Sequence, residues 1–327
     1  MLGARPSCPS PAARLRAAET GWPTMLERLR QVAMLVQDLP EASQLYRRIL
    51  GMEHCRAQKL PQYDLSNQVL PAGEGTFIEL LQPTSDESPA GRYLRRRGEA
   101  PYLLIFETQA YDELIPHLKS LGVRITAETR TEATRSAFVH PSSANGAFLE
   151  IVEVSDATNP WPPAGPNWLK QGVPPRTRRL RQVAILVRDL DEATEHWGRM
   201  FGITATRRFQ ISFTDLEIAV LPLNDKSTFI ELAQPTSPDT SSARFLRRYG
   251  EGIYLTIFEI EDSLAVDDYL KGQDVRYTTS RRTDNYVNLG FNSIWLHPAS
   301  MKGAFIQLSQ VLDERNPWPP AGDDWYL

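Results

Sequence analysis

Two glutamates, Glu79 and Glu231, each lie in the middle of a segment with the composition of a β-strand. The segment occurs twice, as Thr-Phe-Ile-Glu-Leu-Leu-Gln-Pro-Thr-Ser over residues 76–85 and as Thr-Phe-Ile-Glu-Leu-Ala-Gln-Pro-Thr-Ser over residues 228–237. A carboxylate buried in a strand costs free energy unless a partner satisfies it. In a dry site its pKa rises, which suits it to remove a proton from a carbon next to a carbonyl. The alternative is a structural carboxylate that neighbouring Gln and Tyr side chains satisfy.

Each copy carries further polar side chains, one near its beginning and one near its end. Glu150 is a second acid in the first copy, whereas Gln307, its counterpart in the second, cannot transfer protons. Gln31 and Gln182 are the single uncharged polar residues in two apolar strand segments. Amides both donate and accept hydrogen bonds, so these three glutamines could hold a substrate carbonyl oxygen. Alternatively, they only fill polar positions in the strands.

The elements that must position these residues are also duplicated. Asp38 and Asp189 are suited to begin helices as N-caps, and Gly51 and Gly202 are suited to end them. Strands follow, and a second helix is expected in each copy at residues 111–121 and 263–271 before a closing His-Pro segment. The sequence therefore predicts an α+β fold of four β-α-β-β-β units in two paired repeats.

The repeated motifs resemble the vicinal oxygen chelate superfamily (glyoxalases, bleomycin-resistance proteins and extradiol dioxygenases). The resemblance rests on Gln-Val-Ala-Ile-Leu-Val-Arg-Asp-Leu-Asp-Glu-Ala, on Phe-Ile-Glu-Leu-x-Gln-Pro, and on His-Pro followed by Gly-Ala-Phe-x-Glu/Gln. Each repeat is most similar to methylmalonyl-CoA epimerase. This implies two glyoxalase-like domains in tandem, each curled into a cup with one site. We expect an extension without fixed structure at 1–25, domains at 26–168 and 178–327, and a linker at 169–177.

In this superfamily the cup usually binds a divalent metal through four strand positions, typically His, Glu or Gln, His and Glu. The resemblance assigns these positions to Gln31, Glu79, Leu103 and Glu150 in the first repeat and to Gln182, Glu231, Leu255 and Gln307 in the second. Both histidines are replaced in each repeat, and leucine cannot bind a metal. We therefore expect no metal cofactor, although three side chains of the first cup could weakly hold a hard cation such as Mg²⁺. Leu103 and Leu255 are left as apolar substrate contacts.

These positions predict an enzyme of the epimerase, isomerase or lyase type that acts on an acyl-CoA or a small oxo-acid. Glu79 would act as the base, Glu150 as the partnering acid, and Gln31 would hold the substrate oxygen, with Glu231 as the base of the second cup. A second hypothesis is a protein that sequesters a ligand without chemistry, as bleomycin-resistance proteins do. A third is a ring-cleaving dioxygenase, which would need an iron site that the residues do not supply.

Composition limits the partners and the compartment. The formal net charge of −4 and the pI of about 5.8 give no basic field for nucleic acid, and no apolar run is long enough to span a membrane. Two cysteines, Cys8 and Cys55, cannot form a disulfide framework, which fits a reducing cytoplasm. We expect a cytoplasmic monomer or homodimer whose partner is a small-molecule substrate.

Several remaining features have mainly structural interpretations. The heptapeptide Asn-Pro-Trp-Pro-Pro-Ala-Gly, at 159–165 and again at 316–322, predicts a strap across the outside of the sheet or, alternatively, a pocket wall. Strand alternation places Tyr102 and Tyr254 on the face opposite the neighbouring leucines. Five other positions receive structural or surface roles: strand-end caps at Asp64 and Asp215, and solvent-facing side chains at His54, His117 and His196.

Overall fold

The computed structural model describes residues 23–170, 174–211, 214–280 and 290–326. Most of the predicted extension, with Cys8, lies outside these residues. Met25, at the end of that predicted segment, is buried, and its backbone N–H donates to the Phe201 carbonyl over 2.9 Å. The predicted domain boundaries otherwise stay predictions. None of the helices in the described part of the chain is long and apolar enough to cross a bilayer.

The first repeat forms one eight-stranded sheet in the order β2-β3-β4-β1-β5-β8-β7-β6. Its strands are β1 (Arg28–Leu35), β2 (Arg56–Leu60), β3 (Leu65–Gly73), β4 (Thr76–Pro83), β5 (Ala100–Glu107), β6 (Ile125–Arg130), β7 (Thr134–Val139) and β8 (Phe148–Val154). Strand β1 pairs parallel with β4 and antiparallel with β5, so it joins the two units of the repeat. The pairing confirms two β-α-β-β-β units in one sheet.

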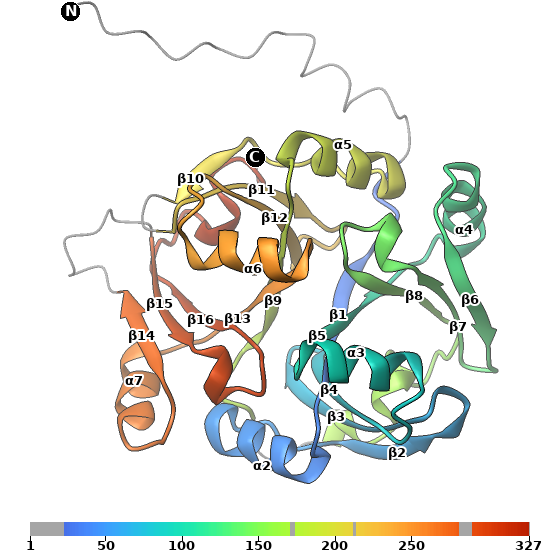
Figure 1. Cartoon of the computed structure of the whole chain (residues 1–327), viewed down its shortest axis with the longest axis horizontal. Helices are drawn as coiled ribbons and strands as arrows, with labels where there is room; N and C mark the ends of the chain where they lie inside the picture. Colours follow the sequence, from blue (N-terminus) through green and yellow to red (C-terminus); the bar gives the residue numbers. More distant parts are fainter. Residues whose placement is uncertain (1–22, 171–173, 212–213, 281–289, 327) are drawn as a thin grey trace, which may run out of the picture.

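The second repeat forms a matching sheet in the order β10-β11-β12-β9-β13-β16-β15-β14. Its strands are β9 (Arg179–Leu186), β10 (Phe209–Ile211), β11 (Leu216–Pro222), β12 (Phe229–Pro235), β13 (Gly252–Glu259), β14 (Tyr277–Ser280), β15 (Phe291–Leu296) and β16 (Ile306–Val311). The two curled sheets lie side by side (Figure 1). The α+β fold of four units in two glyoxalase-like repeats is confirmed.

The helices begin and end where their capping residues predict. The N–H of Glu41 donates to Asp38 at the start of α2 (Leu39–Leu50), and that of Glu192 donates to Asp189 at the start of α5 (Leu190–Phe201). Gly51 ends α2 in the left-handed region with φ of 70°, where glycine is favoured. The remaining helices are α3 (Pro89–Arg97), α4 (Tyr111–Ser120), α6 (Ser241–Tyr249) and α7 (Ser263–Lys271).

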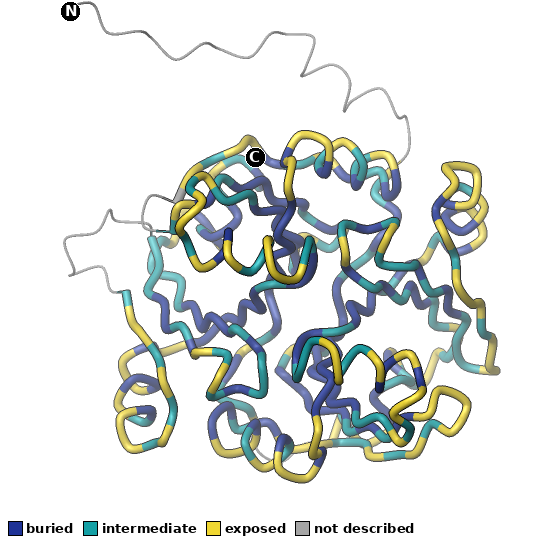
Figure 2. The backbone as a smooth tube through the Cα atoms, viewed as in Figure 1, coloured by how far each residue is buried: buried dark blue, intermediate teal, exposed yellow. Residues whose placement is uncertain are grey.

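Each sheet buries its two faces against different partners. The outer faces of both sheets, with α2, α4, α5 and α7, contribute to one continuous apolar core that the repeats share. Each inner face has its own separate apolar cluster, which includes residues of α3 in the first repeat and of α6 in the second. The buried strands and exposed outer helix faces are visible in Figure 2. The inner faces are the predicted cups.

Two histidines join the repeats instead of facing solvent. A ring nitrogen of His117 on α4 lies 2.8 Å from the carbonyl oxygen of Arg199, and that of His196 on α5 lies 2.8 Å from the carbonyl oxygen of Ser143. The prediction of a solvent-facing side chain is therefore wrong for both, whereas the third histidine predicted to face solvent, His54, is exposed. The error arises because the convex faces of the two repeats pack together, which single-repeat reasoning does not reveal.

A pair of threonines forms matched hydrogen bonds between the repeats and gives a test of this packing. The Thr76 hydroxyl accepts from the backbone N–H of Leu180, and the Thr228 hydroxyl accepts from that of Leu29, each over 2.8 Å. Thr76→Val or Thr228→Val is expected to lower the free energy of unfolding by about 1–3 kcal/mol, because a buried N–H loses its acceptor. Urea unfolding measures the change, with Thr76→Ser as the control. Full stability in both valine variants would contradict the predicted contribution.

Candidate functional site

The floor of the first cup holds a chain of buried polar side chains. The Trp161 indole N–H donates to Gln31 Oε1 over 2.6 Å, and Gln31 Nε2 donates to Glu79 Oε2 over 3.0 Å. Asn67 Nδ2 donates to the other oxygen of Glu79 over 2.5 Å. Burial raises the pKa of Glu79, while the hydrogen bonds from Asn67 and Gln31 and the charge of Arg56 oppose the rise. Both carboxylate oxygens of Glu79 are therefore engaged by amides.

The second cup repeats this chain without the asparagine. Trp318 Nε1 donates to Gln182 Oε1 over 2.7 Å, and Gln182 Nε2 donates to Glu231 Oε2 over 2.6 Å. By strand register, Ile218 stands where the first cup has Asn67. Burial raises the pKa of Glu231 to about 7, and the Gln182 hydrogen bond only partly opposes it.

The strap does not cross the outside of the sheet as its sequence predicts. Trp161 and Trp318 are fully buried, and each belongs to the apolar cluster of its cup. The large apolar ring enters the concave face because that face offers both apolar neighbours and a hydrogen-bond acceptor for the indole. The alternative interpretation, a lid or a pocket wall, stays a prediction.

Glu150 on β8 lies in the same cup as Glu79 but has fewer partners. It is half-buried, and the hydroxyl of Ser136 hydrogen-bonds to it. Burial is the main cause that raises the pKa of Glu150 to about 7; the charge of Glu79 adds to the rise and the Ser136 hydrogen bond opposes it. A carboxyl with this pKa exchanges protons readily near neutral pH.

Tyr63 closes the edge of the first cup above Glu150. It lies in a short turn before β3, its hydroxyl hydrogen-bonds with Thr129 of β6, and its ring centroid is 6.2 Å from that of Phe138. Burial, with the charge of Glu150, raises the pKa of the Tyr63 phenol. The turn thus connects two edges of the sheet that are far apart in strand order.

Gln307 occupies the position of Glu150 in the second cup, but its amide is fully engaged. Its oxygen accepts from the Trp295 indole over 3.1 Å, and its nitrogen donates to Ser293 and Ser309 over 3.0 and 2.9 Å. This network fills a vacated polar position, so Gln307 offers no group to a substrate in this arrangement. The two cups therefore differ where the first one has its half-buried acid.

Aromatic side chains form a wall beside Glu150, and two of them overturn a prediction. Tyr102 and Tyr254 pack against the inner apolar clusters together with Leu103 and Leu255, not on the opposite face. The register of β5 and of β13 shifts at these tyrosines, so a β-bulge places two successive side chains on one face. The Tyr102 ring lies 5.5 Å from that of Phe148.

The remaining predicted positions have structural roles. Asp64 and Asp215 adopt positive φ in the turns before β3 and β11, as expected for strand-end caps. The ring nitrogens of His140 and His297 accept backbone N–H groups in the His-Pro turns. Cys55 is a free thiol whose pKa burial raises to about 11, so it is no ready nucleophile.

A family model described as the Glyoxalase/Bleomycin resistance protein/Dioxygenase superfamily matches residues 30–139 and 181–288, which together exceed half of the chain. The chain belongs to this superfamily. One matched stretch falls in each repeat.

Individual relatives match a length close to that of one repeat. Mitochondrial methylmalonyl-CoA epimerase of Homo sapiens is 28% identical over 154 residues, which are 43% of this chain and 87% of the relative. Ethylmalonyl-CoA/methylmalonyl-CoA epimerase of Cereibacter sphaeroides is 29% identical over 135 residues, 40% of this chain and all of the relative.

A mutant of 4-hydroxymandelate synthase from Streptomyces coelicolor has a TM-score of 0.71 at 16% identity, covering 90% of this chain and 96% of that one. This last likeness shows a shared fold across all four units.

The metal typical of the superfamily does not fit the residues of either cup. Leu103 and Leu255 cannot ligate, and the amide oxygens of Gln31 and Gln182 already accept indole N–H groups. Within the described residues, no three His, Cys, Asp or Glu side chains group closely enough to hold an ion. No step of the proposed chemistry therefore passes through a metal.

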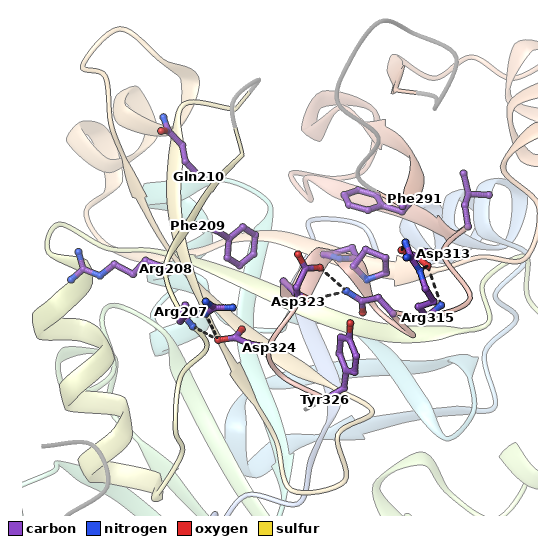
Figure 3. A pocket seen from close by; sticks show the side chains of 16 residues that line it. Arg207, Arg208, Phe209, Gln210, Phe291, Asp313, Arg315, Asp323, Asp324 and Tyr326 are labelled. Carbon is purple, nitrogen blue, oxygen red and sulfur yellow. Dashed lines mark hydrogen bonds and ion pairs between the residues drawn. The ribbon is translucent and has the colours of Figure 1, made fainter. Parts of the chain in front are cut away.

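An open cavity of about 800 Å³ lies beside the strap of the second repeat (Figure 3). Phe209, Phe291 and Tyr326 line it together with several charged side chains. Those charges are compensated locally, since Arg207 pairs with Asp324 over 3.2 Å and Arg315 pairs with Asp313 over 3.1 Å. The cavity shows no converging polar groups that define a reaction.

Proposed function

We propose that the first cup catalyses proton transfer at a carbon next to a carbonyl, with Glu150 as the proton-transferring group. The observation that supports this is the contrast between the two acids of the cup. Glu79 is buried with both oxygens engaged by amides, whereas Glu150 is half-buried, has one hydroxyl partner and lies beside an aromatic wall. Because a base must reach its substrate, Glu150 replaces Glu79 as the base.

In this mechanism the Glu150 carboxylate takes the α-proton of a substrate held against Tyr102 and Phe148. The electron pair of the broken C–H bond moves to the carbonyl oxygen and gives an enolate. The hydroxyl of Tyr63 is a nearby group able to donate to that oxygen, whereas the single proton of the Ser136 hydroxyl is already donated to Glu150. The Glu150 carboxyl then trades the abstracted proton for a deuteron from solvent, and delivery of that deuteron to the same carbon regenerates the carboxylate and completes the exchange.

The relatives support the substrate class of this proposal. Epimerases whose names specify methylmalonyl-CoA or ethylmalonyl-CoA match the chain over the length of one repeat. Acyl-CoA thioesters and small oxo-acids both carry the acidic α-proton that the mechanism requires. The cytoplasmic location and the monomeric or homodimeric state stay predictions.

Deuterium exchange tests the proposal. The purified full chain is incubated in D₂O with methylmalonyl-CoA, ethylmalonyl-CoA or a panel of oxo-acids, and α-deuterium is measured by mass spectrometry. The exchange rate is expected to rise with pH to a plateau, with a midpoint near 7, because only the deprotonated Glu150 accepts a proton. A parallel sample with a chelator should behave identically. Exchange no faster than in buffer across the panel would contradict the proposal.

Ligand sequestration is the second candidate, and the aromatic wall of the first cup favours it. Rings of Tyr93, Tyr102, Phe148 and Phe138 follow one another at centroid distances of 5.0–5.8 Å and form an aromatic surface against which an apolar ligand can pack. Stoichiometric binding of a ligand without any α-proton exchange would decide for this function.

A further inference from the structure

The strap of the first repeat is attached to two successive residues of β1. Gln31 accepts the Trp161 indole N–H, and Arg30 lies over the same ring at 5.1 Å and reaches the Pro160 carbonyl. Successive strand residues normally face opposite ways. Here the register of β1 against β5 shifts between Leu29 and Gln31, so a bulge at Arg30 lets both residues face the strap.

The second repeat has the same attachment. Arg181 lies over Trp318 at 5.2 Å, and the register of β9 against β13 also shifts next to Gln182. In both repeats the tryptophan is fully buried, and the glutamine behind it donates its amide N–H to a glutamate. The unit of tryptophan, glutamine and glutamate, which we term the strap anchor, is thus built twice.

We propose that Glu79 and Glu231 are positioning residues that fasten the strap into each cup by orienting Gln31 and Gln182. A carboxylate only accepts hydrogen bonds, so it draws the glutamine NH₂ group toward itself. The amide oxygen then faces the indole N–H of the strap tryptophan. The glutamate therefore acts on the strap through the glutamine.

The differences between the repeats support a role that is separate from proton transfer. The second cup has Ile218 in place of Asn67 and Gln307 in place of Glu150, so it lacks the second acid of the first cup. Its strap anchor is nevertheless complete, with hydrogen bonds of 2.7 and 2.6 Å. Fastening the strap thus accounts for Glu79 and Glu231 alike, whereas the proposed acid–base chemistry, which uses Glu150, accounts for neither.

Paired substitutions separate fastening from basicity. Glu79→Gln removes the basicity of the carboxylate but keeps an acceptor for Gln31, and the Asn67 amide can turn to accept from the new NH₂ group because its oxygen has no other partner. Glu79→Leu removes both properties. Glu231→Gln and Glu231→Leu form the matching pair in the second cup.

The readout is hydrogen exchange of the indole N–H groups, followed by NMR on ¹⁵N-tryptophan-labelled full chain at pH 8. Trp161→Phe and Trp318→Phe identify the two signals. The leucine variants are expected to speed exchange of the indole in their own cup by at least about fivefold, the usual weight of one hydrogen bond. The glutamine variants should stay within about twofold of the unchanged protein, and the strap tryptophan of the other cup serves as the internal control.

Two results would overturn the proposal: leucine variants whose strap indoles stay protected, or glutamine variants that lose protection as fully as the leucine variants. If Glu79→Leu does not fold, the Glu231 pair decides alone, because the apolar Ile218 already lines that cup. The readout needs no substrate, so a failure of α-proton exchange in the unchanged protein leaves this test intact.

Discussion

Glu150→Gln is expected to lower the rate of α-proton exchange by at least about 100-fold, the smaller contribution usual for a general base. An amide of nearly the same shape cannot take a proton, and the hydroxyl of Ser136 can still donate to its oxygen. The second cup shows that a glutamine fits at this position, although there the Gln307 amide nitrogen donates to Ser293 and Ser309. Exchange of the best substrate in D₂O, compared with the unchanged protein at pH 8, measures the effect.

The same substitution is expected to make the protein more stable at high pH. The pKa of Glu150 rises from an ordinary 4.5 to about 7 in the folded chain, so folding favours its neutral form. Between pH 4.5 and 7 the unfolded chain releases this proton while the folded chain retains it, and stability falls as pH rises. Above pH 7 the full cost remains, roughly 1–3 kcal/mol after allowance for partial exposure. Glu150→Gln removes this cost at pH 8 and has little effect at pH 4.5.

Urea unfolding at both pH values measures this effect, with Glu153→Gln as the matched control. Glu153 lies on the same strand and pairs with Arg135 at 2.6 Å, outside the cup. That variant should retain α-proton exchange. If Glu150→Gln exchanges α-protons at the normal rate, Glu150 is not the base. If the free energy of unfolding at pH 8 does not rise in this variant, burial of the Glu150 carboxylate does not destabilise the folded chain.

The fold follows from the sequence because its determinants are local and occur twice. The side chains of Asp38 and Asp189 each accept a hydrogen bond from a free backbone N–H group at the start of a helix. Gly51 and Gly202 take the positive φ that ends those helices. Because these capping residues recur at the same spacing in both copies, each of them indicates the same four β-α-β-β-β units.

The sequence alone could not assign the sheet face of residues that lie at β-bulges. Alternation with a period of two assigns Tyr102 to the face opposite Leu103, and the register shift in β5 reverses that assignment. The same is true of Arg30 beside Gln31. A bulge depends on how two strands pair; Pro101 adjoins the bulge at Tyr102, but no glycine or proline adjoins the one at Arg30.

The site also depends on contacts between distant segments. Trp161 and Gln31 are 130 residues apart, and Asn67 and Ser136 come from strands on opposite sides of the cup. Asn67 is the middle one of three successive polar residues in β3, so the sequence did not single it out as the partner of Glu79, although buried polar groups need partners. The sequence does not indicate that Tyr63 contacts Thr129 of β6, because this contact depends on how far the sheet curves.

Trp161→Ala is expected to lower the free energy of unfolding by about 3–5 kcal/mol, the usual cost of removing a buried aromatic ring. The ring is fully buried in the first cup, stacks under Arg30 and satisfies Gln31. The variant therefore loses packing and also leaves the Gln31 amide oxygen without its donor. Trp161→Phe keeps most of the packing, so it should lower the free energy of unfolding by less. Its effect isolates the contribution of the hydrogen bond to Gln31.

Free indole provides the decisive control for this variant. The Trp161→Ala cavity has the shape of the removed ring and retains the Gln31 acceptor, so millimolar indole should bind it and restore part of the lost stability. Benzene fills the same space but cannot donate a hydrogen bond, and it should restore less. Trp318→Ala is expected to behave in the same way in the second cup, and the unchanged protein should not respond to either compound. Thermal unfolding with and without each ligand measures these effects. A Trp161→Ala variant of normal stability would show that the strap does not pack into the cup, and the strap anchor would then have no physical basis.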